Sequence, residues 1–437
     1  MMNVELPEAF LSRMHLQLGS ELPAFLCAME EPPVRGLRIN PLKPESRNCQ
    51  ISMGDPIPWE KNGWYIPEGL TPGTTLWHEA GAFYLQDPGA MIPVNVLNPR
   101  PGEMILDLCA APGGKSTQIA AAMEGKGLLV CNEPIPKRAQ VLSRNLERMG
   151  VRNAVAVSAM PDKLAEKWPE GFDAVLVDAP CSGEGMFRRE PETRLEWTAD
   201  QAAGCARRQM DILNAAALLV RPGGRMVYAT CTFNPAENEE NVERFLNMHP
   251  DWETEEFHLP GVDGNRGMFT CFPHRTRGEG QFAALLRKKG DTPATIPEDG
   301  SLPRPGRDTG RLLKEQFPFF PSGTHMFGST VVHMPFCPDL KGIRIYRLGL
   351  HLAECREKRV IPDHASASAA IEGGAHINLT DEAALRFMAG ETVNGEQTGW
   401  TVACWNGMPL GWGKGSNGVI KNHLPKGLRN GRLTLNG

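Results

Sequence analysis

The stretch MILDLCAAPGGKSTQIAAAMEG, from Met104 to Gly125, joins a short apolar run to a helical pattern through a turn of small residues. MILDLCAA is typical of a buried strand, and KSTQIAAAMEG is typical of a helix that ends at Gly125. The two glycines in the turn allow the backbone to approach a ligand closely, and the start of the helix then faces that ligand. The stretch therefore predicts a strand, a ligand-binding loop and a helix in succession.

The residues after Gly125 repeat this alternation. The apolar runs GLLVCNE, AVAVSA, FDAVLVDAP and RMVYATC are separated by helical segments such as PKRAQVLSRNLERMG. Strands that alternate with helices predict an α/β fold with a parallel, doubly wound sheet. Ligands of such sheets bind at the carboxyl ends of the strands. The unusual residues all fall there, namely Asp107 to Lys115, Glu133, Asp178 to Cys181, and Thr230 with Cys231.

The turn itself has three weaker interpretations. GKS also occurs in phosphate-binding P-loops, but that motif requires a glycine five residues before Gly114, where Cys109 stands. The turn contains no GxGxxG, which argues against a dinucleotide fingerprint. A tight turn that binds no ligand is the third interpretation, since glycine often only shapes a turn.

The length of 437 residues exceeds one ordinary core, so we expect several domains. Residues 1–85 combine a helical start with short extended pieces rich in Pro and Gly, which predicts a small α+β domain. The alternating pattern predicts the main domain over 86–290. A stretch rich in Pro, Gly, Asp and Thr then begins a linker and connecting region over 291–340. Short strands and turns predict a compact β-rich module over 341–437.

Composition limits the class of protein. Hydrophobic residues make up 41% and charged residues 22% of the chain, and no run of about 18 apolar residues predicts a membrane span. The N-terminal MMNVELPEAFLSRMHL has neither a basic n-region nor an apolar h-region, so we expect a cytoplasmic protein with no membrane contact. Eleven cysteines occur without a CxxC pair. This pattern argues against a zinc site and a disulfide scaffold, and we expect no metal.

The net charge of -5 conceals local basic patches. The C-terminal segment from Gln397 to Gly437 has no Asp or Glu but contains Lys414, Lys421, Lys426, Arg429 and Arg432. A second basic cluster consists of Arg275, Arg277, Arg287, Lys288 and Lys289. Contact with nucleic acid depends on such patches rather than on the total charge.

Two cysteines, Cys181 and Cys231, follow neighbouring strands at the predicted ligand edge. A single cysteine is more often a buried structural residue, but a pair beside a nucleoside-type pocket suits covalent chemistry on cytosine. A thiolate that adds to C6 makes carbon 5 able to attack a sulfonium methyl group, whereas N- or O-methylation needs no cysteine. A second thiol can assist the later release. Asp178 is suitably placed to give a proton or hydrogen bond to N3.

The charged residues near these cysteines predict more ordinary roles. Arg188 and Arg189 offer positive charge for a phosphate backbone. The acids Glu237, Glu239 and Glu240 begin a helix, and we expect them to stabilise its start through the helix dipole.

Together these motifs resemble the Sun-type RNA 5-methylcytosine methyltransferases. The resemblance covers nearly the whole chain and includes RINPLK (Arg38 to Lys43) and HEAGAFYLQDPGAM (His78 to Met91). It implies a Rossmann-like class I methyltransferase domain. It also implies S-adenosylmethionine as cofactor, bound by Cys109, Ala110, Ala111, Pro112, Gly113, Gly114, Lys115, Glu133 and Asp178.

The same resemblance assigns roles to the two thiols and shows one departure. It implies that Cys231 is the nucleophile and that Cys181 helps to release the product. An Asp that contacts the adenine end of the cofactor in the family is replaced here by Met160. The adenine contact is therefore expected from backbone groups or from Asp162.

Within this family the likeness is greatest to the RsmF type, which modifies 16S ribosomal RNA near the decoding centre. The tail LGWGKGSNGVIKNHLPKGLR resembles its PUA-like RNA-binding module. Trp400, Trp405 and Trp412 alternate there with Lys and Arg, as in surfaces that stack bases and bind phosphates, although we expect most of these tryptophans in a core.

The resemblance therefore implies a monomeric enzyme that methylates carbon 5 of cytosine, with 16S rRNA or the small ribosomal subunit as partner. It also implies that the N-terminal domain binds RNA. Two alternatives stay open, a tRNA cytosine-C5 methyltransferase and a catalytically silent RNA-binding assembly factor. The second would tolerate loss of Cys231 or Asp178, and both are present.

Overall fold

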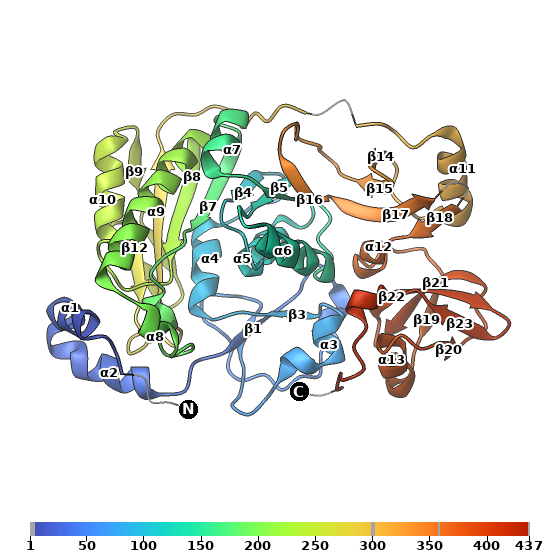
Figure 1. Cartoon of the computed structure of the whole chain (residues 1–437), viewed down its shortest axis with the longest axis horizontal. Coiled ribbons are helices and arrows are strands. Elements are labelled where there is room, and N and C mark those ends of the chain that lie inside the picture. Colours follow the sequence, from blue (N-terminus) through green and yellow to red (C-terminus); the bar gives the residue numbers. More distant parts are fainter. Residues whose placement is uncertain (1–4, 299–301, 357–358, 436–437) are drawn as a thin grey trace.

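The computed structural model of the protein describes residues 5–298, 302–356 and 359–435 (Figure 1). Its central sheet has nine strands in these residues, in the order β12-β13-β8-β7-β4-β5-β6-β16, with β9 beside β13. The strands are β4 (Met104–Asp107), β5 (Leu128–Asn132), β6 (Ala154–Ser158), β7 (Phe172–Asp178), β8 (Val220–Thr230), β9 (Trp252–Thr254), β12 (Met268–Cys271), β13 (Gln281–Lys288) and β16 (Arg344–Leu348). The five strands from β8 to β6 run parallel, with β13 and β16 antiparallel at either side. The predicted α/β fold is confirmed.

Helices cover both faces of this sheet, with α4, α5 and α6 on one face and α7, α9 and α10 on the other (Figure 1). Their bounds, with that of the short α8, are α4 (Ile92–Leu97), α5 (Gly114–Met123), α6 (Pro136–Arg148), α7 (Pro161–Lys167), α8 (Thr193–Glu196), α9 (Ala199–Leu219) and α10 (Glu239–Met248). Strand β7 shows why both faces are covered. Val175 and Val177 pack into one core, whereas Ala174 and Leu176 pack into the opposite one. A strand that is apolar on both sides requires helices on both faces.

The N-terminal part combines a helical hairpin with a small antiparallel sheet, β2-β1-β3. Its elements are α1 (Glu8–Leu18), α2 (Leu22–Glu30), β1 (Gly36–Ile39), β2 (Gly63–Tyr65), α3 (Leu76–Glu79) and β3 (Phe83–Leu85). The RINPLK segment fastens this part to the central domain. Arg38 donates to the carbonyl oxygen of Gly114 (3.0 Å), and Lys43 donates to that of Arg148 (2.9 Å). These carbonyls lie at the start of α5 and the end of α6, so the motif is a docking element.

The remaining short elements lie around the central sheet. A hairpin of β10 (Phe257–Leu259) and β11 (Val262–Gly264) follows β9. Single 3-10 turns are η1 (Gly19–Glu21), η2 (Pro44–Asn48), η3 (Pro72–Thr74), η4 (Gly89–Met91), η5 (Glu184–Met186), η6 (Asn265–Gly267) and η7 (Lys426–Leu428).

The C-terminal part contains two further sheets. The first has the order β14-β15-β17-β18 and the second the order β19-β21-β22-β23-β20. The elements are α11 (Arg307–Gln316), β14 (Thr324–Phe327), β15 (Thr330–His333), β17 (Leu350–Arg356), β18 (Arg359–Pro362), α12 (His364–Ser368), β19 (His376–Asn378), α13 (Asp381–Met388), β20 (Val393–Asn394), β21 (Gly399–Trp405), β22 (Met408–Ser416) and β23 (Val419–Asn422).

The structure differs from the linker predicted over 291–340. Residues 299–301 of that stretch lie outside the described residues, but α11, β14 and β15 follow them. Since β14 and β15 share one sheet with β17 and β18, the predicted boundary at residue 340 divides a folded unit. The next strand, β16, leaves this unit and joins the central sheet beside β6. The described residues before α11 in this stretch, which are those rich in Pro, Gly, Asp and Thr, form no named helix or strand, so the prediction was wrong in extending the linker to residue 340.

The C-terminal module packs against the N-terminal part. The Trp77 and Trp405 rings lie 4.7 Å apart between their centroids, and both are buried. Trp412 is buried as well, while Trp400 is partly exposed, so the expectation that most tryptophans of the tail are core residues is confirmed. Among the described helices, none is both long enough and apolar enough to cross a bilayer.

Candidate active site

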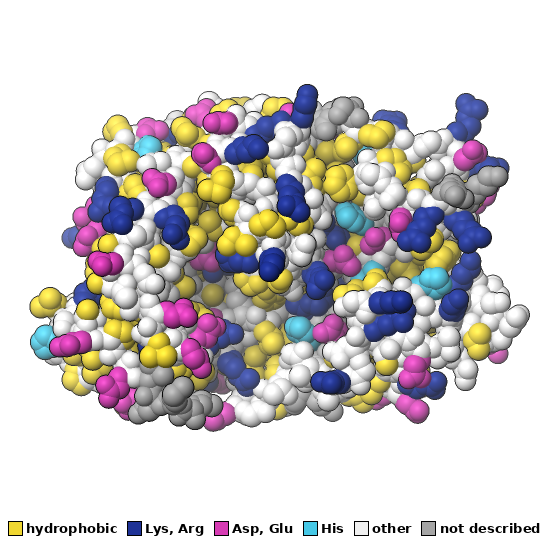
Figure 2. Space-filling view, in the orientation of Figure 1, with side chains coloured by type: hydrophobic (Ala, Val, Ile, Leu, Met, Phe, Trp, Pro, Cys, Tyr) yellow, Lys and Arg dark blue, Asp and Glu magenta, His cyan; other side chains and the backbone are white. Residues whose placement is uncertain are grey.

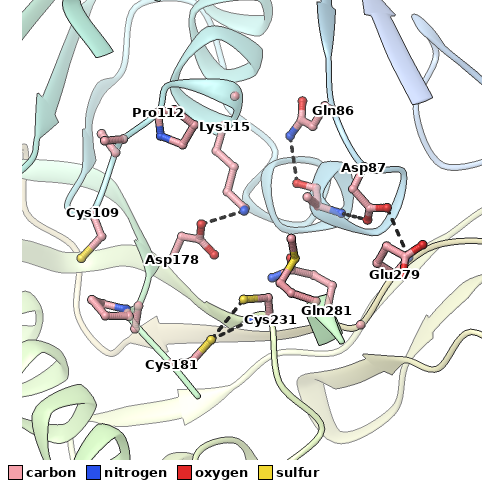
Figure 3. A pocket seen from close by; sticks show the side chains of 18 of the residues that line it. Gln86, Asp87, Cys109, Pro112, Lys115, Asp178, Cys181, Cys231, Glu279 and Gln281 are labelled. Carbon is pink, nitrogen blue, oxygen red and sulfur yellow. Dashed lines mark hydrogen bonds and ion pairs between the residues drawn. The ribbon is translucent and has the colours of Figure 1, made fainter. Parts of the chain in front are cut away.

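A cavity of about 400 Å³ lies where β4, β7 and β8 end (Figure 3). Its lining brings together most of the predicted site residues, namely Cys109, Ala110, Ala111, Pro112, Gly114, Lys115, Asp178, Cys181 and Cys231. Gly113 and Glu133 are outside the lining. Since the carboxyl ends of parallel strands meet at one edge, segments far apart in sequence converge here.

The backbone of the loop before α5 shapes one wall of the cavity. Gly113 has φ 114°, in the left-handed region that favours glycine. A Cβ on Gly114 would lie 3.2 Å from Cε1 of Tyr84, which explains the second glycine. Arg138 donates to the carbonyl of Ala111 (3.0 Å), and this contact holds the loop against α6. The wall is therefore open to a ligand that approaches the backbone.

Lys115 and Asp178 form an ion pair inside the cavity, with Nζ and Oδ2 2.7 Å apart (Figure 3). Burial alone would lower the pKa of Lys115, but the adjacent Asp178 carboxylate outweighs it, and the pKa is raised. Lys115 therefore remains protonated. Just before the loop, Asp107 is fully buried and accepts a hydrogen bond from the Ser116 hydroxyl (2.6 Å). Burial raises the pKa of Asp107 to about 7.

Cys181 and Cys231 face each other on the opposite wall, with their sulfur atoms 3.2 Å apart (Figure 3). The backbone N–H of Cys231 also donates to the Cys181 sulfur (3.3 Å). The hydrogen bond with the Cys231 sulfur, together with burial, raises the pKa of Cys181 well above its ordinary value. Cys181 is therefore held as a thiol, and either sulfur atom can be the donor in this contact. The described residues contain no disulfide and no cluster of ligands suited to a metal ion.

The residues expected at the far end of the cofactor lie beside the cavity. Glu133 is buried, accepts from the N–H of Ile135 (2.9 Å) and lies 3.3 Å from Arg138, which does line the cavity. Met160 is 62% exposed just before α7, and Asp162 lies in the first turn of that helix.

Two charged groups near the thiols differ from their predicted roles. Arg188 is buried against the Glu279 carboxylate at 2.7 Å, so it is not available to a phosphate, whereas Arg189 is exposed and lines the cavity. Glu239 and Glu240 occupy the first turn of α10 as expected. Glu237 precedes this helix instead and is fully buried among hydrogen-bond donors. Sequence position alone could not separate these acids, because their burial depends on distant segments.

The second basic cluster is largely neutralised by neighbouring acids. Its ion pairs are Arg275 with Glu21, Arg277 with Asp55, Arg287 with Glu255, and Lys288 with Glu170. The predicted patch is therefore weaker than its sequence indicates, because each partner lies far away along the chain.

Several lining residues were missed by the sequence analysis. Tyr84, Gln86 and Asp87 lie in the HEAGAFYLQDPGAM segment, whereas Glu279 lies just before β13 and Gln281 begins it. Burial, together with the nearby Glu279 carboxylate, raises the pKa of Asp87 to about 6. Asp87 could have been predicted from the sequence, because it is an acid directly before a proline in the HEAGAFYLQDPGAM motif. The residues around the start of β13 carried no such sequence signal. Because β13 runs antiparallel, it brings its amino end to this edge, whereas the sequence analysis looked for site residues at the carboxyl ends of strands.

Four family profiles match the chain in succession. They are the N-terminal domain of 16S rRNA methyltransferase RsmF (residues 6–88), 16S rRNA methyltransferase RsmB/F (94–287), the RsmF rRNA methyltransferase first C-terminal domain (311–369) and the methyltransferase RsmF PUA domain (375–430). A ribosomal RNA small subunit methyltransferase F from Aeromonas hydrophila is 32% identical, over 98% of each chain. The chain belongs to the RsmF family of 16S rRNA methyltransferases.

Other relatives agree with this RsmF assignment. The methyltransferase F of Aeromonas salmonicida is 33% identical over 98% of both chains. Among solved structures, PH0851 superposes with a TM-score of 0.60 at 29% identity, over 65% of this chain and 66% of its own. The NSun6 of Pyrococcus horikoshii, solved with SFG, has a TM-score of 0.57 over 65% of this chain and 99% of its own. At 22% identity it supports the methyltransferase fold alone.

Proposed function

We propose that this RsmF-family protein transfers a methyl group from S-adenosylmethionine to carbon 5 of a cytosine in 16S rRNA, in the decoding region of the small subunit. The reaction proceeds through a covalent bond between Cys231 and C6 of the base. The observation that carries this proposal is the pair of thiols, 3.2 Å apart, on the wall of a cavity that also holds Lys115 and Asp178. Methylation of a nitrogen or an oxygen would need neither thiol.

The residues beside the thiols fit the proposed cofactor. The 109–115 loop offers small side chains and the start of α5, so an adenosyl group can lie against backbone. Glu133 can accept from the ribose hydroxyls if its half-exposed partner Arg138 turns away. Because Met160 stands where the family has an Asp, the adenine is contacted by backbone groups or by Asp162. When bound, S-adenosylmethionine supplies an electrophilic methyl group on a sulfonium.

The two thiols divide the covalent chemistry. The Cys231 thiolate adds its electron pair to C6. At the same time Asp178 passes a proton to N3, and Lys115 supplies that proton to Asp178. Carbon 5 then forms its bond to the methyl group as the methyl–sulfur bond breaks with its electron pair staying on sulfur, and N3 returns its proton to Asp178. Loss of the C5 proton to a base restores the ring double bond and breaks the bond between C6 and sulfur. Cys181 donates a hydrogen bond to the departing Cys231 thiolate and so assists release.

The other parts of the chain are proposed to hold the RNA. The target base has to leave its stack to reach the cavity, so contacts on both sides of it are needed. Lys414 and Lys421 are exposed neighbours on β22 and β23, and Lys414 lies 5.3 Å from the centroid of the Trp400 ring. Figure 2 shows Lys and Arg side chains gathered over the C-terminal part. We expect residues 1–85 to contribute a second RNA contact, and the protein to act in the cytoplasm as a monomer.

The experiment that tests this function is bisulfite sequencing of 16S rRNA from a strain that lacks the gene. One or more cytosines near the decoding centre are expected to lose their protection and to regain it on complementation. Incubation of the purified protein with 16S rRNA, small subunits and tRNA, each with radiolabelled cofactor, identifies the substrate. Labelling of tRNA alone would support the tRNA alternative, and no labelling would support the silent assembly factor.

A further inference from the structure

The two thiols lie on neighbouring loops, residues 179–187 (the β7 loop) and residues 231–238 (the β8 loop). Glu237 extends from the β8 loop to the β7 loop. Its carboxylate accepts from the backbone N–H of Ser182 (2.9 Å) and from the Ser182 hydroxyl, which also contacts the hydroxyl of Thr232 (2.9 Å). A buried acid of the β8 loop therefore holds Ser182, whose hydroxyl links the residue after one thiol to the residue after the other.

Glu184 makes the reciprocal contact, from the β7 loop to the β8 loop. It accepts from the backbone N–H of Phe233 (3.3 Å), and its side chain is fully buried. The cation that balances it comes from the N-terminal helix α1, where Arg13 contacts both carboxylate oxygens at 2.8 and 2.6 Å. Gln17, one turn further along α1, donates to the carbonyl of Phe233 (3.1 Å). One face of α1 thus contacts both thiol loops.

We propose that Arg13 and Glu184 are positioning residues for methyl transfer, through which the N-terminal helix holds the two thiol loops in register. The proposal rests on the proposed function, because it gives the distance between the two sulfur atoms a chemical purpose. Attack on C6 and release from it both depend on this distance, and a displacement of about 1 Å can cost on the order of 10²-fold in rate.

Attachment of the helical hairpin does not require this ion pair. Phe10 packs edge-on against Phe187, and Phe25 does the same against Phe233, so aromatic contacts already dock the hairpin. An ion pair that served only attachment could lie at the rim in solvent. The side chains of Arg13 and Glu184 are instead 23% and 0% exposed, and the pair points into the loops.

The same hairpin provides a matched control. Glu21 in η1 pairs with Arg275 of the central domain at 2.6 Å, with side chains 46% and 48% exposed. This pair also joins the hairpin to the central domain, but it touches neither thiol loop. Glu21→Gln therefore removes an equivalent link at the rim.

The test compares single-turnover methyl transfer, at saturating RNA and cofactor, in the full-length protein and its variants. Arg13→Met is expected to lower the rate on the order of 10²-fold, with KM for both substrates unchanged. Arg13→Lys is expected to retain part of the rate. Glu21→Gln is expected to match the wild type. The double variant Arg13→Met/Glu184→Gln removes both charges and leaves no uncompensated charge buried, and it is also expected to be slow. An unchanged rate, a loss confined to KM, or an equal loss in Glu21→Gln would overturn the proposal.

A second measurement does not depend on methyl transfer. The rate at which iodoacetamide alkylates Cys231 is followed against pH by peptide mass spectrometry. In the Arg13 variants this rate profile is expected to differ from that of the wild type, because the two thiol loops no longer hold the sulfur atoms 3.2 Å apart. An unchanged profile contradicts the positioning role. If the wild type makes no 5-methylcytosine, the proposed function fails, and this profile still decides the positioning role.

Discussion

The two walls of the cavity are built in opposite ways. The wall proposed to hold the cofactor is one continuous stretch, residues 109–115, which is shaped by backbone conformation and leads directly into a helix. The wall that carries the thiols joins two loops whose cysteines are 50 residues apart in sequence. Buried carboxylates hold these loops together, and one of their partners, Arg13, is 171 residues from Glu184.

This difference predicts different consequences of mutation. A change in the continuous wall alters the shape that a bound cofactor meets, so it should act on cofactor binding. A change in the thiol wall alters which atoms react and how far apart they lie, so it should act on the rate. Variants in each wall can therefore be compared by separating KM from kcat.

The largest expected effect is that of Cys231→Ala, which removes the proposed nucleophile. Methyl transfer to RNA should be abolished, while the affinity for S-adenosylmethionine measured by calorimetry stays at the wild-type value, because the thiol lies on the other wall. Substantial methyl transfer by this variant would contradict the assignment of Cys231 as the nucleophile. Weakened cofactor binding would show that the two walls are not independent.

Cys181→Ala should act later in the reaction. The covalent bond to C6 still forms, but the departing Cys231 thiolate loses its hydrogen-bond donor, so release slows on the order of 10²-fold. A slowly migrating protein–RNA band is expected on denaturing gels after incubation with RNA and cofactor. Absence of the band in Cys181→Ala, with normal turnover, would remove Cys181 from the release step.

The same contrast explains what the sequence could predict. The continuous wall was recognised because its small residues, its strand and its helix are adjacent in sequence. Glu133 and the two cysteines were placed at strand ends by the same alternating pattern, and family resemblance added the separate roles of the two cysteines. The supports of the thiol wall could not be predicted. Glu237 resembles any acid near a helix start, and Glu184 and Arg13 have no local pattern that relates them. Their roles depend on burial and on contacts between distant segments, which periodicity and motif spacing do not encode.

A smaller effect is expected in the continuous wall from Gly114→Ala. The added Cβ would lie 3.2 Å from Cε1 of Tyr84, so the loop or the ring has to shift by a few tenths of an ångström. We expect KM for S-adenosylmethionine to rise about tenfold, equivalent to ~1.4 kcal/mol, with kcat nearly unchanged. Gly204→Ala is the control, since its Cβ would meet only the end of the Arg207 side chain at 3.9 Å. A loss in kcat alone would contradict the separation of the walls.

The smallest expected effect on methyl transfer is that of Asp107→Asn, whose main consequence is for stability. Unlike Glu184, this buried carboxyl forms no ion pair among the described residues, and its Oδ1 has no hydrogen-bond partner there. Burial raises its pKa from 3.8 to about 7, so the folded state holds a proton that the unfolded chain has lost. The contribution of Asp107 to stability is therefore complete below pH 4 and falls as the pH rises towards 7.

Asn carries no charge to desolvate, so urea unfolding at pH 8 should show Asp107→Asn more stable than the wild type by on the order of 1 kcal/mol, with the difference vanishing near pH 4. Asp173→Asn is expected to change the stability in the opposite direction. Asp173 accepts from Arg221 at 2.7 Å, and that cation would lose its partner. Its stability at pH 8 should fall. If Asp107→Asn were instead the less stable protein at pH 8, the Asp107 carboxylate would have to be compensated in the folded state.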